Sequence, residues 1–246
     1  MICEPSEDSL LDGRVRLFQP ENGYRAAVDP VLLAASVGAV AGDRVLDLGC
    51  GTGAAGLCLL ARVAGLEVTG LEIQSDMADL ARKGRGNGHA LRVITGDVAD
   101  PPDSLNGAIF DHIIANPPYV LEGRGNCPPD PGRAVAHVET EGALGDWVAA
   151  ALRWCRPKGS ITFIHRADRL VDLLALMRDR VGALVIFPLW PIQGKEAKRV
   201  LVQARKGRRT PPRLAAGLVL HDADGRYTDE AEQILRHGAP LDGLAN

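Results

Sequence analysis

The chain has 246 residues, of which 46% are hydrophobic and 24% charged, and its formal net charge is −3 at pH 7. This composition predicts a folded protein with a sizeable core, and it excludes a wholly basic nucleic-acid coat protein while leaving local basic patches open. Five scattered cysteines without a C-x-x-C pair argue against a disulfide framework and against a zinc site, and they favour a reducing compartment.

The N-terminus lacks the basic and apolar regions of a signal peptide, and no apolar run reaches membrane-spanning length. We therefore expect a cytoplasmic protein that has no membrane partner and no metal.

Strand-like segments alternate with helix-like segments along the chain. The first helix is expected over residues 29–39, with Asp29 as its N-cap and Pro30 in the first helical position. The expected strands cover residues 44–49, 67–72, 91–97, 110–116, 159–165, 183–190 and 198–205. The expected helices between them cover residues 54–64, 75–83, 141–156 and 168–180, and a strand or turn and a helix follow within 220–241.

Strands that are apolar at consecutive positions and separated by helices indicate a parallel sheet that is covered on both faces. We therefore expect an α/β fold with a doubly wound, mostly parallel sheet. No internal repeat and no long linker divides the chain, so one domain is expected over residues 1–246. Residues 1–28 would form an N-terminal extension of this domain, and residues 208–246 a C-terminal extension.

A long segment rich in Gly and Pro covers residues 120–140, directly after the strand expected at 110–116. Because open sheets of this class bind ligands at the carboxyl ends of their strands, the segment should lie over the site as a substrate loop or lid. Its composition fits a disordered insertion equally well.

A glycine-rich loop, DLGCGTGAAG (47–56), follows a strand and opens a helix, which is where a nucleotide-type cofactor meets the backbone. Gly51, Gly53 and Gly56 spell G-x-G-x-x-G. Glu72 ends the next strand, where its carboxylate could accept from ribose hydroxyls, as in an NAD-dependent oxidoreductase. The alternative is that the glycines only shape a tight turn and the acids are solvated strand ends.

Asp47 and Gly49 extend the motif to D-x-G-x-G-x-G, which resembles the first motif of class I S-adenosylmethionine-dependent methyltransferases. The resemblance implies a Rossmann-like, seven-stranded sheet whose last strand is antiparallel, and S-adenosylmethionine as the cofactor. It also implies that Glu72 holds the ribose and that Asp97 lies by the adenine. The cofactor-binding residues of the loop would be Asp47, Gly49, Gly51 and Gly53.

The expected strand 110–116 runs into Asn116, Pro117, Pro118 and Tyr119. Prolines end the strand and stiffen the turn. A conjugated amino group is a poor nucleophile, and two fixed acceptors on its hydrogens would free its lone pair: the Asn116 amide oxygen and the Pro117 carbonyl. Tyr119 would supply a face for a flat base or amide. We therefore expect Asn116, Pro117 and Tyr119 to be catalytic, with Asn116 also bordering the cofactor.

The Asn-Pro-Pro-Tyr tetrapeptide resembles the catalytic motif of amino-methyltransferases that act on adenine N6, cytosine N4 or glutamine side chains. RLFQPENGYRAAVDPVLLAA (16–35) and GKEAKRVLVQARKG (194–207) resemble segments of bacterial tRNA adenine-N6 methyltransferases that modify adenosine 37 of valine tRNA. This resemblance, from Leu10 to Gly207, implies a tRNA substrate and places Arg25 and Asp29 beside the cofactor. The glycine-rich RKGRGNGHA (82–90) departs from the family pattern, so the preceding helix should end early.

Seven basic residues lie within fifteen positions of an otherwise acidic chain: Lys195, Lys198, Arg199, Arg205, Lys206, Arg208 and Arg209. We expect the first five to contact phosphates of a tRNA. Lysines on a solvated strand edge that deters edge-to-edge pairing would give a similar pattern.

The expected function is methylation of adenine N6 in a tRNA. A glutamine N5-methyltransferase acting on a release factor would share the chemistry, but such enzymes usually carry an N-terminal helical domain, and only some forty residues precede Arg44. A DNA adenine enzyme would need an added recognition domain. Residues 116–119 disfavour an oxidoreductase, and an intact Asn116 disfavours a silent cofactor-binding module. His112 and His165 receive no functional role, and the oligomeric state stays open.

Overall fold

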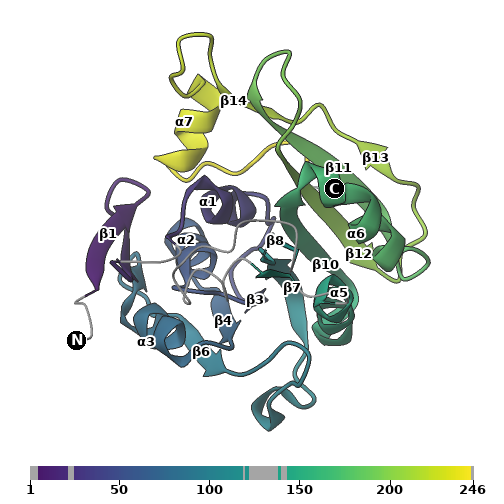
Figure 1. Cartoon of the computed structure of the whole chain (residues 1–246). Helices are drawn as coiled ribbons and strands as arrows, with labels where there is room; N and C mark the ends of the chain where they lie inside the picture. Colours follow the sequence, from purple (N-terminus) through teal and green to yellow (C-terminus); the bar gives the residue numbers. More distant parts are fainter. Residues whose placement is uncertain (1–4, 22–24, 119, 122–137, 140–142, 245–246) are drawn as a thin grey trace.

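The computed structural model describes residues 5–21, 25–118, 120–121, 138–139 and 143–244. Its centre is a nine-stranded sheet in the order β13-β11-β12-β10-β7-β3-β4-β6, with β14 paired to β11 (Figure 1). The strands of this sheet are β3 (Arg44–Leu48), β4 (Glu67–Glu72), β6 (Arg92–Thr95), β7 (Phe110–Ala115), β10 (Cys155–Arg166), β11 (Val181–Ile192), β12 (Arg199–Lys206), β13 (Arg213–Leu214) and β14 (Leu218–His221).

The doubly wound, mostly parallel sheet is confirmed. Strands β10, β7, β3, β4 and β6 run parallel to one another, whereas β12 is antiparallel to both of its neighbours, β10 and β11. The antiparallel strand is the last of the seven that the sequence predicts. Two short strands from the C-terminal extension, β13 and β14, widen the sheet beyond those seven.

The helices lie between the strands as expected, with boundaries that differ by a few residues. They are α1 (Val28–Ala35), α2 (Ala54–Arg62), α3 (Ser75–Lys83), α5 (Ala143–Trp154), α6 (Leu170–Met177) and α7 (Asp229–Leu235), with single 3-10 turns at Asp103–Leu105 and Ala167–Arg169. Helix α3 ends at Lys83, before Gly84, so the expected early end is confirmed. None of the helices in the described ranges is both long and apolar enough to cross a membrane.

The expected N-cap at Asp29 is wrong. Helix α1 begins at Val28, one residue earlier, and Ala27 precedes it without a side-chain cap. Asp29 therefore lies inside the first turn, where its carboxylate accepts from Nε of Arg199 at 3.0 Å. The ion pair with a distant strand replaces the local cap.

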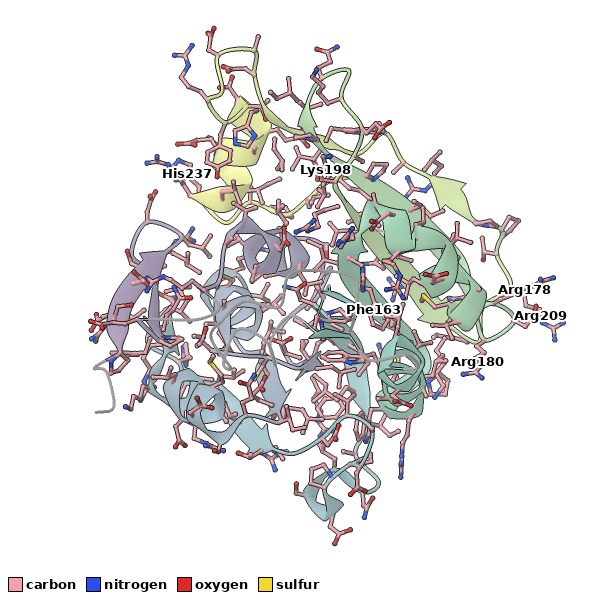
Figure 2. The ribbon with its side chains drawn as sticks, viewed as in Figure 1. Phe163, Arg178, Arg180, Lys198, Arg209 and His237 are labelled. Atoms are coloured by element: carbon pink, nitrogen blue, oxygen red, sulfur yellow. The ribbon has the colours of Figure 1, made fainter. Side chains whose placement is uncertain are left out.

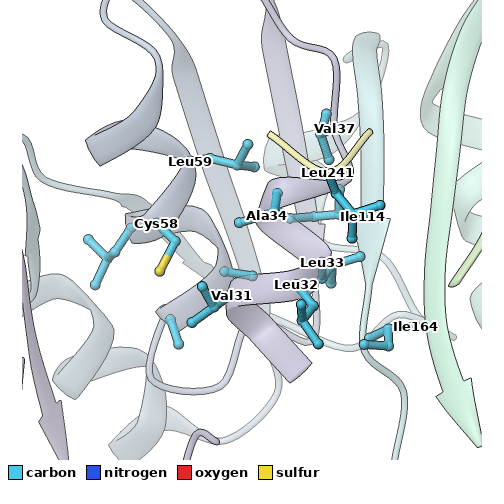
Figure 3. Close-up of a cluster of buried hydrophobic side chains, with 14 of the residues drawn as sticks. Val31, Leu32, Leu33, Ala34, Val37, Cys58, Leu59, Ile114, Ile164 and Leu241 are labelled. Atoms are coloured by element: carbon cyan, nitrogen blue, oxygen red, sulfur yellow. The ribbon is translucent and has the colours of Figure 1, made fainter. Parts of the chain in front are cut away.

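Each face of the sheet has its own cluster of buried apolar side chains. Along β7, Ile114 belongs to the cluster beneath α1 and α2, and Ile113 belongs to the cluster beneath α5 and α6. Figure 3 shows Ile114 and Ile164 of the sheet beside the apolar side chains of α1. Because both faces are covered, the central strands are apolar at consecutive positions rather than at alternate ones.

The N-terminal extension forms a hairpin that the sequence analysis did not anticipate. Strands β1 (Ser6–Leu10) and β2 (Val15–Gln19) pair antiparallel to each other. On its other side, β2 pairs antiparallel with the short strand β5 (Arg85–Gly86). Val15 and Leu17 are fully buried, whereas Arg16 between them is exposed. This period of two is the signal of a half-buried strand.

The C-terminal extension packs against α1 and α2. Helix α7 is capped by Thr228, whose hydroxyl accepts from the Ala231 N–H at 3.2 Å. The Arg62 guanidinium of α2 donates to the carbonyl of Gly238 at 3.1 Å and to that of Ala34 in α1. The Leu241 N–H donates to the Ala35 carbonyl at 2.9 Å, so the extension closes over the end of α1.

A buried polar link ties three strands together where β3, β7 and β10 begin to pair. His112 of β7 lies between Ser160 of β10, with 2.6 Å from Nδ1 to Oγ, and Asp43 just before β3, with 3.1 Å from Nε2 to Oδ2. Burial lowers the pKa of His112, and the Asp43 carboxylate opposes this shift. The serine is buried, so the link belongs to the packing of the sheet.

Gly86 offers a test of how the hairpin is docked. A Cβ at Gly86 would lie 2.1 Å from the Leu57 carbonyl oxygen, which belongs to the α2 backbone. Gly86→Ala should therefore lower the free energy of unfolding by roughly 1–3 kcal/mol, as overpacking does. Gly38→Ala is the control, because its Cβ would meet no atom within 4 Å. Equal stability of the two variants in urea unfolding would contradict the docking.

Candidate active site

The site lies where strands β3, β4, β6 and β7 end, an edge of the sheet that we call the carboxyl edge. Leu48 pairs with both Ala115 and Leu71, and Glu72 pairs with Thr95. The glycine loop after β3, Glu72 at the end of β4 and Asn116 after β7 therefore lie at one level of the sheet. Neighbouring strands are about 4.8 Å apart, so these three groups are close neighbours.

Glu72 is held by backbone groups from two loops. One carboxylate oxygen accepts from the Gly51 N–H at 2.8 Å and the other from the Gln74 N–H at 2.9 Å. The residue is only 5% exposed, and burial raises its pKa while these N–H groups oppose the shift. An ionised carboxylate has about four lone-pair positions, so each oxygen keeps capacity for a hydroxyl donor of a ligand.

Asp47 lies beneath the loop. Its carboxylate is 2% exposed and accepts from the Gly56 N–H in the first turn of α2 at 3.2 Å. Burial raises the pKa of Asp47 to about 7, and the nearby Glu72 carboxylate adds to this rise. The buried Asp47 carboxylate therefore stabilises the start of α2 through its hydrogen bond with the Gly56 N–H. Its expected contact with the cofactor stays a prediction.

The glycines of the loop meet two structural requirements, a positive φ and, at Gly49, a close contact that leaves no room for a side chain. Gly49, Gly51 and Gly53 all have positive φ, which side chains other than that of glycine rarely adopt. A Cβ at Gly51 would point into open space, whereas one at Gly49 would lie 2.2 Å from the Trp147 ring. The loop thus presents bare backbone on one side and is covered by an indole on the other.

Trp147 and Ile73 were missed in the sequence analysis. Trp147 comes from α5, and its contact with Gly49 is tertiary, so no local pattern signals it. Ile73 is 57% exposed although it is large and apolar, and it directly follows Glu72. The sequence did contain one signal for Ile73, an apolar residue directly after the ribose-binding candidate Glu72, but its exposure is visible only in the structure.

The remaining cofactor candidates are less tightly grouped. Asp97 is half-buried at the carboxyl edge, and its carboxylate accepts from the Ala99 N–H at 2.9 Å. Arg25 turns to the N-terminal hairpin, where it donates to Ser6 Oγ at 2.8 Å and forms an ion pair with Asp8. Asp29 pairs with Arg199. The contacts of Arg25 and Asp29 therefore join chain segments, and their place beside the cofactor stays a prediction.

Asn116 and Pro117 follow β7 directly, with Asn116 half-buried and Pro117 buried. Tyr119 lies outside the described residues. Of the segment 120–140, only Val120–Leu121 and Val138–Glu139 are described, as the short parallel pair β8 and β9. The role of Tyr119 and the lid role of this segment therefore stay predictions.

The five basic residues expected to bind RNA do not form one cluster. Lys195, Lys198 and Arg199 lie at the carboxyl edge, since Arg199 pairs with Arg166 at the end of β10. Arg205 and Lys206 lie at the other end of β12, roughly 20 Å away at the usual strand rise of about 3.3 Å per residue. They are tied to the main chain there: Lys206 Nζ donates to the Cys155 carbonyl at 2.8 Å.

His165, at the carboxyl end of β10, is buried near the guanidinium groups of Arg169 and Arg199. Its Nδ1 accepts from the Arg166 N–H at 2.8 Å. Burial lowers the pKa of His165 to about 4, and the positive charges of Arg169 and Arg199 lower it further. The imidazole is therefore neutral near pH 7. Within the described ranges, no group of three or more His, Cys, Asp or Glu side chains is placed to hold a metal ion.

The strand order, the glycine loop after β3 and the buried carboxylate after β4 define a class I S-adenosylmethionine-dependent methyltransferase. The residues fit this cofactor, because Gly51 opens on free space beside a carboxylate that can accept from ribose hydroxyls. A family model described as "Methyltransferase small domain" matches residues 28–126.

Relatives and solved structures agree with this class. The tRNA1(Val) (adenine(37)-N6)-methyltransferase of Porphyromonas gingivalis (strain ATCC BAA-308 / W83) is 30% identical over 84% of this chain and 85% of its own length. That of Actinobacillus pleuropneumoniae serotype 5b is 29% identical over 85% and 87%. A solved structure, a predicted O-methyltransferase from Agrobacterium tumefaciens, has a TM-score of 0.71 and 27% identity, over 87% of this chain and 98% of that one. The chain belongs to the family of tRNA1(Val) (adenine(37)-N6)-methyltransferases.

The raised pKa of Asp47 gives a dependence of stability on pH. Between pH 4 and 7 the folded chain keeps a proton that an unfolded aspartate has lost, so the free energy of unfolding should fall as the pH rises and level off above 7. Asp47→Asn keeps an acceptor for the Gly56 N–H but cannot ionise. The variant should lack most of this fall, which amounts to roughly 2–3 kcal/mol between pH 5 and 8 in the wild type. Urea unfolding measures it, with the exposed Asp242→Asn as control, and parallel curves for Asp47→Asn and the wild type would disprove it.

Glu72 allows the cofactor to be tested directly. Glu72→Ala removes a charge-assisted acceptor and should cost about 1.5–3 kcal/mol of S-adenosylmethionine affinity by calorimetry. Glu67→Ala, at the exposed start of the same strand, should change nothing. NAD should not bind the wild type. An unchanged affinity in Glu72→Ala would remove Glu72 from the site.

Proposed function

We propose that the protein transfers a methyl group from S-adenosylmethionine to the exocyclic N6 of adenosine 37 in a valine tRNA. The observation that carries this proposal is the strand register: Leu48 pairs with Ala115, so the glycine loop and the Asn116–Pro117 acceptors stand side by side. Relatives that match most of this chain are named for this reaction, and their names are the basis on which we propose a valine tRNA as the substrate.

The chemistry follows from the amino group of adenine, whose lone pair is delocalised into the ring. The Asn116 side-chain oxygen and the Pro117 carbonyl would accept its two hydrogens and hold the nitrogen so that its lone pair points out of the ring plane. Proline fixes the carbonyl in advance, which is the preorganisation that such a step requires. The cofactor supplies an electrophilic methyl group on a sulfonium. Tyr119 is proposed to hold the face of the base.

The substrate must bring the adenine out of its stack. Sequence-specific recognition of RNA usually targets bases in single-stranded loops, which can be splayed into a pocket. Lys195, Lys198 and Arg199 are proposed to contact phosphates near that base, because they lie at the carboxyl edge. Arg199 would act together with Asp29, its ion-pair partner. We propose that the whole chain is one methyltransferase domain acting on tRNA in the cytoplasm.

The experiment that tests the function is methylation of separated pools. The protein is incubated with labelled S-adenosylmethionine and with total RNA, total protein or DNA, and the labelled RNA is digested and mapped. Label in N6-methyladenosine at position 37 of a valine tRNA is the expected result. Label in glutamine of a protein would instead support the glutamine N5-methyltransferase alternative.

Asn116 should separate chemistry from cofactor binding. The two acceptors matter most as the nitrogen becomes positive, so their loss should lower the rate more than it weakens binding. Asn116→Ala should reduce methyl transfer at saturating substrate by roughly a hundredfold or more, with S-adenosylmethionine affinity unchanged. The exposed Asn106→Ala serves as control. Normal tRNA methylation by Asn116→Ala would show that the motif is structural.

A further inference from the structure

Within the described residues, a dense accumulation of positive charge lies away from the active site, at the edge of the sheet where β12 ends. Three segments meet there: residues 155–159 at the start of β10, residues 178–182 where the chain passes from α6 into β11, and residues 205–210 at and after the end of β12. We refer to them as the three turns. We call their exposed surface the distal basic patch. Its basic residues are Arg156, Lys158, Arg178, Arg180, Arg205, Lys206, Arg208 and Arg209.

Hydrogen bonds and strand pairs hold the three turns together. Lys206 pairs with Val181 and Arg205 with Ser160, so the last turn lies between the other two. The Ala183 N–H donates to the Thr210 carbonyl at 2.9 Å, and Arg205 Nη1 reaches the Lys158 carbonyl at 3.5 Å. Figure 2 shows Arg178, Arg180 and Arg209 at one corner of the molecule, apart from Lys198.

The backbone of each turn is shaped to turn tightly. Lys158, Asp179 and Gly207, one in each turn, have positive φ. Such positions allow the chain to reverse direction within a few residues. The cations of the patch that the turns display are exposed: Arg156, Lys158, Arg178, Arg180, Arg208 and Arg209.

Few acids balance these cations. The three turns contain one acidic residue, Asp179, which is 3.8 Å from Arg178 and strongly exposed, and Asp111 of β7 pairs with Arg156 at 3.0 Å. At the carboxyl edge, by contrast, Arg166, Arg169 and Arg199 each pair with an aspartate. The patch is thus the more positive surface, in a chain whose net charge is −3.

The basic residues of β12 do not serve to prevent edge-to-edge pairing of an exposed strand. Strand β12 lies inside the sheet with β10 and β11 on its two sides, so its basic residues have no unpaired edge to protect. That alternative explanation of the basic segment is therefore wrong. Eight basic groups lie on this one surface, and the acids beside them are Asp179, Asp111 and Asp43, the last two of which interact with Arg156. Such an excess of cations has the character of a phosphate-binding footprint.

We propose that the distal basic patch binds the phosphate backbone of a tRNA outside the anticodon stem–loop, whose loop carries the methylated adenine. This inference rests on the proposed function for the identity of the RNA. The patch lies roughly 20 Å along β12 from the carboxyl edge. This distance is at least about six base pairs, because an A-form RNA duplex rises less per base pair than the roughly 3.4 Å of B-form DNA. The patch would therefore meet the part of a full-length tRNA that lies beyond the short anticodon stem, which the isolated stem–loop lacks.

The test uses the full chain with Arg178, Arg180 and Arg209 all changed to glutamine. The matched control changes Arg92, Arg226 and Arg236 to glutamine, which removes the same charge from exposed positions elsewhere. Binding of a full-length valine tRNA transcript and of its isolated anticodon stem–loop is measured by anisotropy at several salt concentrations. Binding of S-adenosylmethionine reports that each variant is folded.

The patch variant should bind full-length tRNA at least tenfold more weakly than the control, with a salt slope flatter by about two to three units. Its affinity for the stem–loop, and its rate of stem–loop methylation, should match the control. Unchanged binding of full-length tRNA would overturn the inference and point to an acidic protein partner. An equal loss for both RNAs would also overturn it.

Failure of the proposed function gives a different result. If the wild-type protein binds tRNA but methylates none, the proposed reaction is wrong, while the two variants still decide whether the patch holds RNA. A weaker affinity of the patch variant alone would then support the inference for RNA in general.

Discussion

The candidate active site is organised around one buried carboxylate, that of Glu72. Glu72 is almost fully buried. Moving an ionised group out of water is unfavourable unless hydrogen bonds replace the lost hydration. The Gly51 and Gln74 N–H groups supply them, and in doing so they fix the loop after β3 to the loop after β4. The shape of the glycine loop and the position of the ribose-binding candidate are therefore a single arrangement.

Much of the fold could be predicted from the sequence because the central strands carry strong local signals. The segments 67–72 and 75–83 have the expected limits, since charged or turn-forming residues end them on both sides. The hairpin at residues 6–19 was missed, although VRLFQ alternates buried and less buried positions, because polar residues interrupt its partner strand. Asp29 failed as an N-cap because a tertiary ion pair with Arg199 competes with the local cap.

The site was predictable where it depends on strand ends and less so where it depends on tertiary packing. Glu72 and Asn116 follow directly from parallel strands that end at one edge. Trp147 covers Gly49 from a helix nearly a hundred residues further along the chain, and no spacing in the sequence encodes that contact. The basic segment shows a related effect: an extended strand separates residues that look adjacent in the sequence, so charges six positions apart face different ends of the molecule.

The position of β12 has a consequence for how the protein is made. It is inserted between β10 and β11, although it is synthesised after both. Until residue 206 has left the ribosome, the edges of β10 and β11 that later pair with β12 have unpaired N–H and C=O groups, although β10 can already pair with β7 on its other side. The nascent chain therefore passes through a stage in which two unpaired strand edges are exposed. During that stage it is open to misassembly with other chains, and to protection by a chaperone.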